Sequence, residues 1–337
     1  MKRLLCLLLS AVTLLCLFSP AWAQEMPNEI PVVAKENITP TPKGVHHYML
    51  ICVDSWAADL TRSGNHTDGL ILVTVDELAG RVMLTSFIRD MLIQRPDGHF
   101  GRINNIMDLM SPQTKAGIDG RQGIQMLVDT INSHFDLEIE HFIVVDFRQV
   151  ENIINAVGGV DIQITPREAT YLKNYAISSA STTPSITAGR GGVYHFSGHA
   201  AVIYMRIRKI ETISYLHADG TVHTDNQDYG RTYRDRVVLS TIADSLKNIT
   251  YDEAMKLLDV IIANTVYTNM STDDLTSALD IAMDLRGVPV EHIRMPIDGT
   301  YEEFPYSGMA TKQIDYLKNR EALHDFLFNQ SFVVADE

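Results

Sequence analysis

The chain has 337 residues, of which 45% are hydrophobic and 21% are charged, and its formal net charge is −14. This composition is typical of a globular protein and excludes wholesale disorder. The acidic balance also argues against a general nucleic-acid binder, which needs a basic face, but it is compatible with a local phosphate site.

The first 23 residues predict a targeting segment. Lys2 and Arg3 precede an apolar run, and Ala21-Trp22-Ala23 is typical of a cleavage site. We therefore expect a signal peptide over residues 1–23, with an uncleaved signal anchor as the alternative. Both interpretations place the rest of the chain outside the cytoplasm. Residues 24–44 contain four prolines and show no helical period, which predicts an extended Pro-rich linker.

The following residues alternate between strand and helix patterns. The apolar runs YMLICVD, LILVTVD and RVMLTSFIRD predict three strands, and the short turn between the second and third predicts a hairpin. Helical spacing of apolar residues follows over 120–134, 148–157 and 231–246, and HFIVVDF predicts a further strand. This alternation predicts an α/β layered domain with a mixed sheet. Residues from 248 onward predict further helices and one strand over 292–295.

Five arginines lie close together in this acidic chain: Arg206, Arg208, Arg231, Arg234 and Arg236. Arg206 and Arg208 would face the same side of a strand, and Arg231 and Arg234 would share a helix face. Because guanidinium groups grip phosphate oxygens two at a time, the two pairs predict a clamp for a diphosphate. The alternative is a solvated helix face with salt bridges to nearby aspartates.

Aspartates and a further cation lie at the predicted strand ends. Asp54 follows the first strand and Asp68 precedes the second, an arrangement that can supply the carboxylates of a Mg²⁺ site beside phosphate oxygens. Asp residues are also common where strands end, so turn chemistry is the alternative. Arg89 and Asp90 end the third strand, where the arginine can aim a further cation at the same edge; a surface ion pair is the alternative. Cys52 lies in an apolar run and predicts a buried, inert thiol.

Other features of the sequence do not indicate a specific function. No Walker loop, nucleotide-binding glycine pattern or zinc-ligand spacing is present. The apolar faces of the helices over 120–134 and 148–157 fit a protein core, with the lining of a lipid-tail channel as the alternative.

The order of these motifs resembles the LytR-CpsA-Psr (LCP) family of bacterial cell-envelope proteins. The resemblance covers about residues 48–247 and rests on Asp54, Asp68, TSFIRD, RIN, FIVVDF, NAVGGVDI, HFSGHAAVIYMRIR and DYGRTYRDR. It implies an α/β/α sandwich around a central mixed β-sheet, with residues 45–247 as the catalytic domain and 248–337 as a C-terminal helical extension. The implied activity is transfer of a polyprenyl-pyrophosphate-linked glycopolymer to peptidoglycan at the outer face of the cytoplasmic membrane.

The resemblance also assigns roles to residues. It implies Mg²⁺ as the cofactor, held by Asp54 and Asp68, and a pyrophosphate site that includes Arg206, Arg208, Arg231 and, less closely matched, Arg121. Arg89, Asp90 and Asp228 are the implied catalytic residues, with the proton acceptor left open between the two aspartates. Arg234 and Arg236 would then lie on the helix surface or behind the site.

This chain departs from the family pattern at several points. His66-Thr67 stand where the family has Arg-Ser, with Arg62-Ser63 upstream, and Asp235 stands where it has Gln. An insertion over residues 211–224 is a candidate lid. The alternatives to a transferase are a polyprenyl-pyrophosphate pyrophosphatase, with water as the acceptor, and a non-catalytic binder of envelope polymers or lipid phosphates.

Overall fold

The computed structural model describes residues 27–329, apart from 57, 61–65, 110–119, 175–176, 178–180, 209, 211–212, 217–221 and 226. The predicted signal peptide or anchor lies outside this range. Among the described residues, no helix has both the length and the apolar character needed to cross a bilayer.

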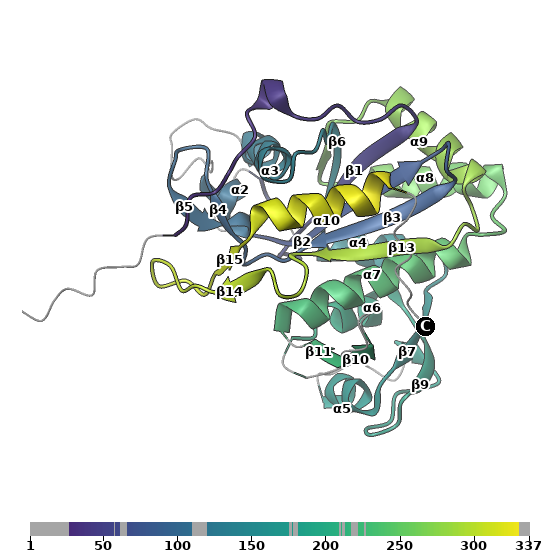
Figure 1. Cartoon of the computed structure of the whole chain (residues 1–337). Helices are drawn as coiled ribbons and strands as arrows, with labels where there is room; N and C mark the ends of the chain where they lie inside the picture. Colours follow the sequence, from purple (N-terminus) through teal and green to yellow (C-terminus); the bar gives the residue numbers. More distant parts are fainter. Residues whose placement is uncertain are drawn as a thin grey trace, which may run out of the picture.

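A central sheet organises the structure (Figure 1). Its strand order is β12-β6-β1-β2-β3-β13. The strands are β1 (Val45–Val53), β2 (Thr67–Asp76), β3 (Arg81–Phe87), β6 (His141–Asp146), β12 (Tyr267–Thr268) and β13 (Val290–Met295). β2 pairs with β3 in antiparallel register, which confirms the predicted hairpin, and β1 pairs with β2 in the same way. In contrast, β6 runs parallel to β1, and β13 runs parallel to β3. The sheet is therefore mixed, as expected.

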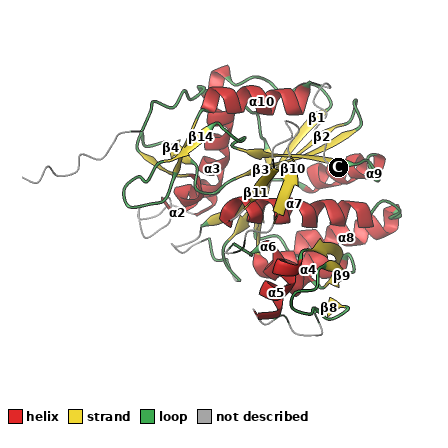
Figure 2. Ribbon diagram, turned by 60° about the horizontal axis from the view of Figure 1, so that its bottom comes forward, coloured by secondary structure: helices red, strands yellow, loops and turns green. Residues whose placement is uncertain are grey.

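Helices cover both faces of this sheet (Figure 2). One face packs against α3 (Gly120–Phe135) and α10 (Tyr316–Phe328). The other is covered by α4 (Phe147–Ala156), α6 (Gly198–Met205), α7 (Gln227–Ser245), α8 (Tyr251–Ala263) and α9 (Thr272–Asp284). The three layers confirm the predicted α/β/α sandwich.

Smaller elements surround the sheet. Short pieces of helix are α2 (Ile106–Leu109), α5 (Pro166–Asn174) and two 3₁₀ turns, Lys35–Asn37 and Ile103–Asn105. The small sheets are β4–β5 (Leu92–Gln94, Phe100–Arg102), β7–β9–β8 (Val160–Ile164, Gly192–Phe196, Thr182–Thr183), β10–β11 (Ile213–Leu216, Val222–Asp225) and β14–β15 (Tyr301–Glu303, Lys312–Ile314). The β10–β11 hairpin occupies the candidate lid, and its side chains lie outside the described part of the chain.

The C-terminal segment is mostly helical, as expected, but it is also part of the sandwich. β12 and β13 form the two edges of the central sheet, and α10 buries Leu323, Phe326 and Leu327 in the core beside α3. Residue 247 therefore does not separate two structural units. The strand predicted over residues 292–295 is β13, whereas β12, only two residues long, was not predicted.

The Pro-rich linker runs along the domain over its described part. Ile30 is buried in the main core, Val33 N donates to Ser133 O at 2.8 Å, and Thr39 N donates to Asp136 Oδ1 at 2.8 Å. Residues 27–44 are thus held against the helical layer that contains α3, and do not extend away from the domain.

Candidate active site

Three predicted site residues lie at one edge of the central sheet. Asp54 follows β1, Asp68 is the second residue of β2, and Arg89 lies just beyond β3. Because Val53 pairs with Thr67 in antiparallel register, the end of β1 meets the start of β2. A hydrogen bond from Asp54 N to His66 O, 2.9 Å long, closes this edge.

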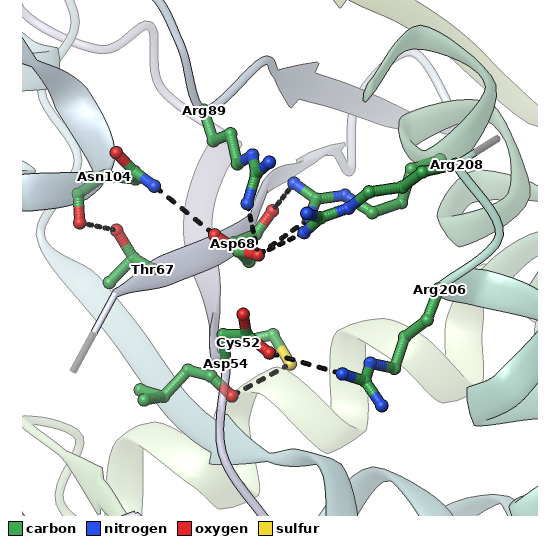
Figure 3. A network of polar contacts seen from close by, with 10 residues as sticks. Cys52, Asp54, Thr67, Asp68, Arg89, Asn104, Arg206 and Arg208 are labelled. Atoms are coloured by element: carbon green, nitrogen blue, oxygen red, sulfur yellow. Dashed lines mark hydrogen bonds and ion pairs between the residues drawn. The ribbon is translucent and has the colours of Figure 1, made fainter. Parts of the chain in front are cut away.

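The Asp68 carboxylate is the centre of the site (Figure 3). Its Oδ2 atom accepts hydrogen bonds from Arg89 Nη1 at 2.7 Å and from Arg208 Nη2 at 2.5 Å. Arg231 Nη1 donates to the same oxygen at 2.9 Å, and Arg231 Nη2 donates to the Asp68 backbone oxygen. Three predicted arginines thus converge on one carboxylate oxygen.

The arginines determine the charge state of this carboxylate. Asp68 is only 4% exposed, and burial by itself would raise its pKa. The positive charges of Arg231, Arg89 and Arg208 outweigh that effect and hold the pKa of Asp68 well below its ordinary value. Asp68 is therefore ionised at neutral pH, and three guanidinium groups converge on its carboxylate. Guanidinium groups are also the donors that best match phosphate oxygens.

Asp54 forms an ion pair with Arg206, another of the predicted site arginines. Arg206 Nη2 lies 3.7 Å from Asp54 Oδ1, and its guanidinium carbon lies 4.3 Å from the centre of the Phe147 ring. Burial, followed by the negative charge of Asp68, raises the pKa of Asp54, and Arg206 opposes this shift. Figure 3 shows the Arg206 side chain directed toward Asp54.

The prediction that Arg206 and Arg208 lie on a strand is wrong. The preceding apolar run forms helix α6, which begins at the Ser197 cap, and Arg206 is its C-terminal cap. A short apolar run does not distinguish a buried helix from a buried strand, because both lack an exposed face. The two arginines nevertheless reach the same site from the loop that follows α6.

Arg234 and Arg236 are buried, so the surface location considered for them is wrong. Arg234 Nε donates to Glu168 Oε1 at 2.9 Å, and both side chains are at most 1% exposed. Arg234 Nη1 donates to Ile207 O at 2.9 Å, and Ile207 lies between Arg206 and Arg208. Arg236 Nη1 donates to Ser86 Oγ on β3. Arg234 therefore fixes the loop that carries the two site arginines.

Asp235 is a buried carboxylate behind the cluster. Burial raises its pKa to about 7, against the opposing charges of Arg231, Arg236 and Arg234. The side chain lines the cavity described below, so this departure from the family pattern lies beside the site.

Asn104 is a site residue to which the sequence argument gave no role, although it belongs to the RIN motif. Its Nδ2 atom donates to Asp68 Oδ1 at 3.3 Å. Its Oδ1 atom is buried and has no hydrogen-bond partner among the described residues. The RIN motif was the only feature of the sequence that pointed to Asn104; no residue spacing did so.

The donor set at this edge fits Mg²⁺. Two neighbouring carboxylates, Asp54 and Asp68, and the Asn104 carbonyl are hard oxygen donors, which suit an ion that also takes phosphate oxygens and water. The described residues contain no group of three or more His, Cys, Asp or Glu side chains arranged for a metal.

The other predicted residues lie around the cluster. Asp90 adjoins Arg89; its backbone oxygen accepts from Lys312 N at 2.9 Å, and its charge acts on Tyr229 of α7. Asp228 lies in the first turn of α7, but its side chain is outside the described part of the structure, as are residues 62 and 63. Arg121 is separate from the cluster. Its guanidinium carbon lies 5.2 Å from the centre of the Tyr267 ring on edge strand β12, with β6 between that strand and β1.

An apolar cavity of about 310 Å³ leads away from the arginines. It lies between the sheet and helices α4, α6, α7 and α8, and Asp68, Arg206, Arg208, Arg231 and Asp235 form its polar end. A second apolar cavity of about 450 Å³ continues under α7, α8 and α9 and shares several lining residues with the first: Leu50, Ile143, Leu239, Ile242 and Ile261. Cys52 also lines the first cavity, and burial raises the pKa of its thiol.

The cavities also decide between the two interpretations, channel lining or core, for the apolar faces of α3 and α4. Val150, Ile153 and Ile154 of α4 line the first cavity, whereas Ile124 and Leu127 of α3 fill the core on the opposite face. The channel interpretation thus fits α4, and the core interpretation fits α3.

Comparisons with known proteins agree with this arrangement. A family model described as the LytR_cpsA_psr family matches residues 24–323. The chain is 25% identical to Biofilm regulatory protein A of Streptococcus mutans over 228 residues, which are 67% of this chain and 49% of that protein. It is also 25% identical to polyisoprenyl-teichoic acid–peptidoglycan teichoic acid transferase TagU of Bacillus licheniformis over 178 residues, which are 53% of this chain and 49% of that protein. The chain thus spans about half the length of these curated relatives.

Solved structures share the fold. One is the LytR-CPS2A-psr family protein YwtF (TagT) with bound octaprenyl pyrophosphate lipid. It superposes with a TM-score of 0.57 over 89% of this chain and 97% of that chain, at 16% identity. At this level of identity the likeness establishes a common fold.

Proposed function

The chain belongs to the LytR_cpsA_psr family, and we propose that it is an extracytoplasmic phosphotransferase. Its donor substrate would be a polyprenyl-pyrophosphate-linked glycopolymer, such as a teichoic acid or capsule, and its acceptor a hydroxyl group of peptidoglycan. The relatives named for teichoic acid transfer and for octaprenyl pyrophosphate support this choice of substrate class.

One observation carries the proposal: an apolar cavity ends at a cluster of arginines. A polyprenyl pyrophosphate has a long hydrocarbon tail joined to two phosphates. The cavities of about 310 and 450 Å³ offer apolar walls for the tail, and Arg206, Arg208 and Arg231 meet the head at the mouth of the first. Each buried CH₂ group of such a tail contributes about 0.8 kcal/mol to binding.

The arginines would hold and polarise the diphosphate. Three guanidinium groups converge on the Asp68 carboxylate, and a diphosphate diester carries two negative charges that such groups bind. Planar guanidinium donors match phosphate oxygens in bidentate geometry. Arg206, Arg208 and Arg231 would hold the two phosphates, and Arg89 would stabilise the charge that develops on the transferred phosphoryl group.

Asp54 and Asp68 would hold Mg²⁺, with Asn104 Oδ1 close by. When bound, this ion supplies charge neutralisation at the diphosphate. The predicted dependence on Mg²⁺ rests on the oxygen donor set alone.

The reaction forms one phosphorus–oxygen bond and breaks another. The acceptor oxygen attacks the phosphorus that carries the polymer, and the bond to the polyprenyl phosphate breaks, so that polyprenyl phosphate leaves. The proton of the acceptor hydroxyl passes to a carboxylate, Asp90 or Asp228. Asp90 adjoins Arg89, and Asp228 lies one turn before Arg231 on α7. Either role is general base catalysis.

The site of action would be the outer face of the cytoplasmic membrane. The predicted signal at residues 1–23 supports export. A polyprenyl substrate resides in the bilayer, so the enzyme would meet its donor there and its acceptor in the adjacent cell wall. The formal charge of −14 argues against DNA as a partner.

The test is an assay of the purified full-length protein in detergent. A labelled polyprenyl-pyrophosphate glycan is incubated with Mg²⁺, with and without peptidoglycan fragments. A transferase yields a glycan–peptidoglycan phosphodiester and polyprenyl phosphate only when the acceptor is present. Equal release of free glycan in both reactions would identify a pyrophosphatase, and tight lipid binding with no turnover would identify a binding protein.

A further inference from the structure

The first turn of α7 contacts three side chains from the end of the chain. The guanidinium carbon of Arg294 lies 4.2 Å from the centre of the Tyr229 ring of α7, and Lys312 Nζ lies 5.2 Å from it. The ring of Tyr301 lies 5.5 Å from the same ring. Arg294 belongs to β13, Tyr301 to β14 and Lys312 to β15. We call Arg294, Tyr301 and Lys312 the C-terminal clamp.

The alternation of β13 directs Arg294 toward α7. Its neighbours Ile293 and Met295 pack against the core that contains α3 and α10. Because successive side chains of a strand face opposite sides, Arg294 faces α7, which runs alongside β13 (Figure 1). Arg294 also pairs in register with Ser86 of β3, whose hydroxyl accepts from Arg236 of α7. The ends of β3 and β13 thus meet α7 together.

The two cations of the clamp are buried. Arg294 is 8% exposed and Lys312 is 6% exposed. Arg294 Nη2 lies 2.5 Å from Asp298 Oδ1, and Lys312 Nζ pairs with Glu303. A cation that is removed from water needs compensating contacts, and the face of an aromatic ring supplies one that is strongest when it is desolvated. The contact between Arg294 and Tyr229 therefore fixes the turn that carries Tyr229.

The clamp reaches both candidates for the proton acceptor. Asp228 is the residue before Tyr229 on α7. Lys312 N donates to Asp90 O at 2.9 Å, so that β15 holds the backbone of the second candidate. Arg231, in contrast, has its own bonds at the arginine cluster. The clamp therefore acts on the proton acceptor more than on the diphosphate site.

We propose that Arg294 is a positioning residue. Its contact with Tyr229 holds the first turn of α7, and with it Asp228, in the place from which the proton of the acceptor hydroxyl is taken. This inference rests on the transferase function proposed above. It makes the segment after residue 290 part of the active site, whereas the family resemblance ends the catalytic domain at residue 247.

The test compares Arg294→Met with Arg81→Met in the full-length protein. Arg81 is the matched control because it also contacts β13, through two bonds of 2.8 Å from its guanidinium group to Glu291. Arg81 begins β3, about 20 Å from the end of that strand at the site. Each substitution leaves one partly exposed carboxylate, so similar falls in Tm are expected. Only Arg294→Met should lower kcat, by about tenfold, with the KM for the lipid donor unchanged.

Substitutions of Tyr229 test the contact itself. Tyr229→Leu should lower kcat about as much as Arg294→Met, and Tyr229→Phe much less, because the aromatic face rather than the hydroxyl group holds the cation. The double variant Arg294→Met, Tyr229→Leu should lose little more than either single variant, because both substitutions remove the same contact. Equal losses in Tyr229→Leu and Tyr229→Phe would overturn the role of the aromatic face.

Hydrogen exchange measures the positioning without turnover. Backbone amides over residues 229–236 should exchange about tenfold faster in Arg294→Met than in the parent protein or in Arg81→Met. If the parent protein transfers nothing but this difference remains, the transferase function fails and the anchoring of α7 by Arg294 stands. Unchanged exchange, together with a kcat equal to that of the control, would overturn the proposal. A rise in the donor KM at unchanged kcat would also overturn it, since Arg294 would then act on donor binding.

Discussion

The buried ion pair between Arg234 and Glu168 allows a quantitative test of how the site loop is held. In Arg234→Met the stem volume is kept, but Glu168 loses its charged partner and Ile207 O loses a donor. Breaking a buried pair costs about 3–5 kcal/mol. Glu168 Oε2 still accepts from Thr165 N at 2.8 Å and from Thr165 Oγ1 at 3.1 Å, which places the cost near the lower limit.

The unpaired carbonyl of Ile207 adds about 1 kcal/mol, so we expect a total loss of about 4 kcal/mol. For a chain of this size each kcal/mol lowers the Tm by about 2 °C, which gives a fall of about 8 °C in circular dichroism melts. The KM for the lipid donor should rise, because the loop that carries Arg206 and Arg208 is no longer fixed. Arg190→Met, at an exposed arginine, is the control and should melt with the parent protein.

A double variant separates pairing from general damage. Arg234→Met combined with Glu168→Gln removes the uncompensated charge, so its stability loss should be smaller than the sum of the two single losses. An Arg234→Met protein that melts with the parent, or a double variant with strictly additive losses, would refute the reasoning.

Four further predictions concern the cavity, the arginine cluster, the metal site and pH. Ile242 lines both apolar cavities. Ile242→Trp should therefore weaken equilibrium binding of a long polyprenyl diphosphate about tenfold, and binding of geranyl diphosphate much less. Equal losses of affinity for the two lipids would show that the tail binds elsewhere. Arg231→Gln should lower kcat/KM about 100-fold or more in the transfer assay, because a guanidinium that holds the diphosphate is lost. Asp54→Asn should weaken Mg²⁺ binding measured by calorimetry. Because the pKa of Asp235 is raised to about 7, its contribution to stability is present below the unfolded pKa, about 4, and is lost as the pH rises to about 7. The Tm of Asp235→Asn relative to that of the parent protein should therefore rise between about pH 5 and pH 8. A Tm difference that does not change with pH would contradict the raised pKa of Asp235.

Local patterns predicted much of the fold because they concern residues close together in the chain. The apolar run of β1 and the helical period of α3 and α4 predicted these elements. The capping box of α4 shows how local such signals are: Asp146 Oδ1 accepts from Gln149 N at 3.0 Å, and Gln149 Oε1 accepts from Asp146 N at 2.9 Å. Their spacing also drew attention to Arg206, Arg208 and Arg231. Arg234, the predicted partner of Arg231, binds Glu168 instead.

Features that depend on distant partners could not be predicted in this way. The burial of Arg234 depends on Glu168, 66 residues away. The edge strand β13 pairs with β3 across more than half of the chain, so its place in the sheet could not be read from its own residues. The lipid cavities are spaces left between elements, and no residue pattern encodes such a space. Packing decided each of these features.

The alternation of β1 explains why one sheet can serve both stability and function. Met49, Ile51 and Val53 point into the core with α3 and α10, whereas Leu50 and Cys52, between them, face the apolar cavity under α4 and α7. Because successive side chains of a strand face opposite sides, the same strand fills one layer and lines a hollow in the other. Its end then places Asp54 where the two faces meet. A lipid held in the cavity on one face would therefore present its phosphates at this edge, beside Asp68 and its arginines.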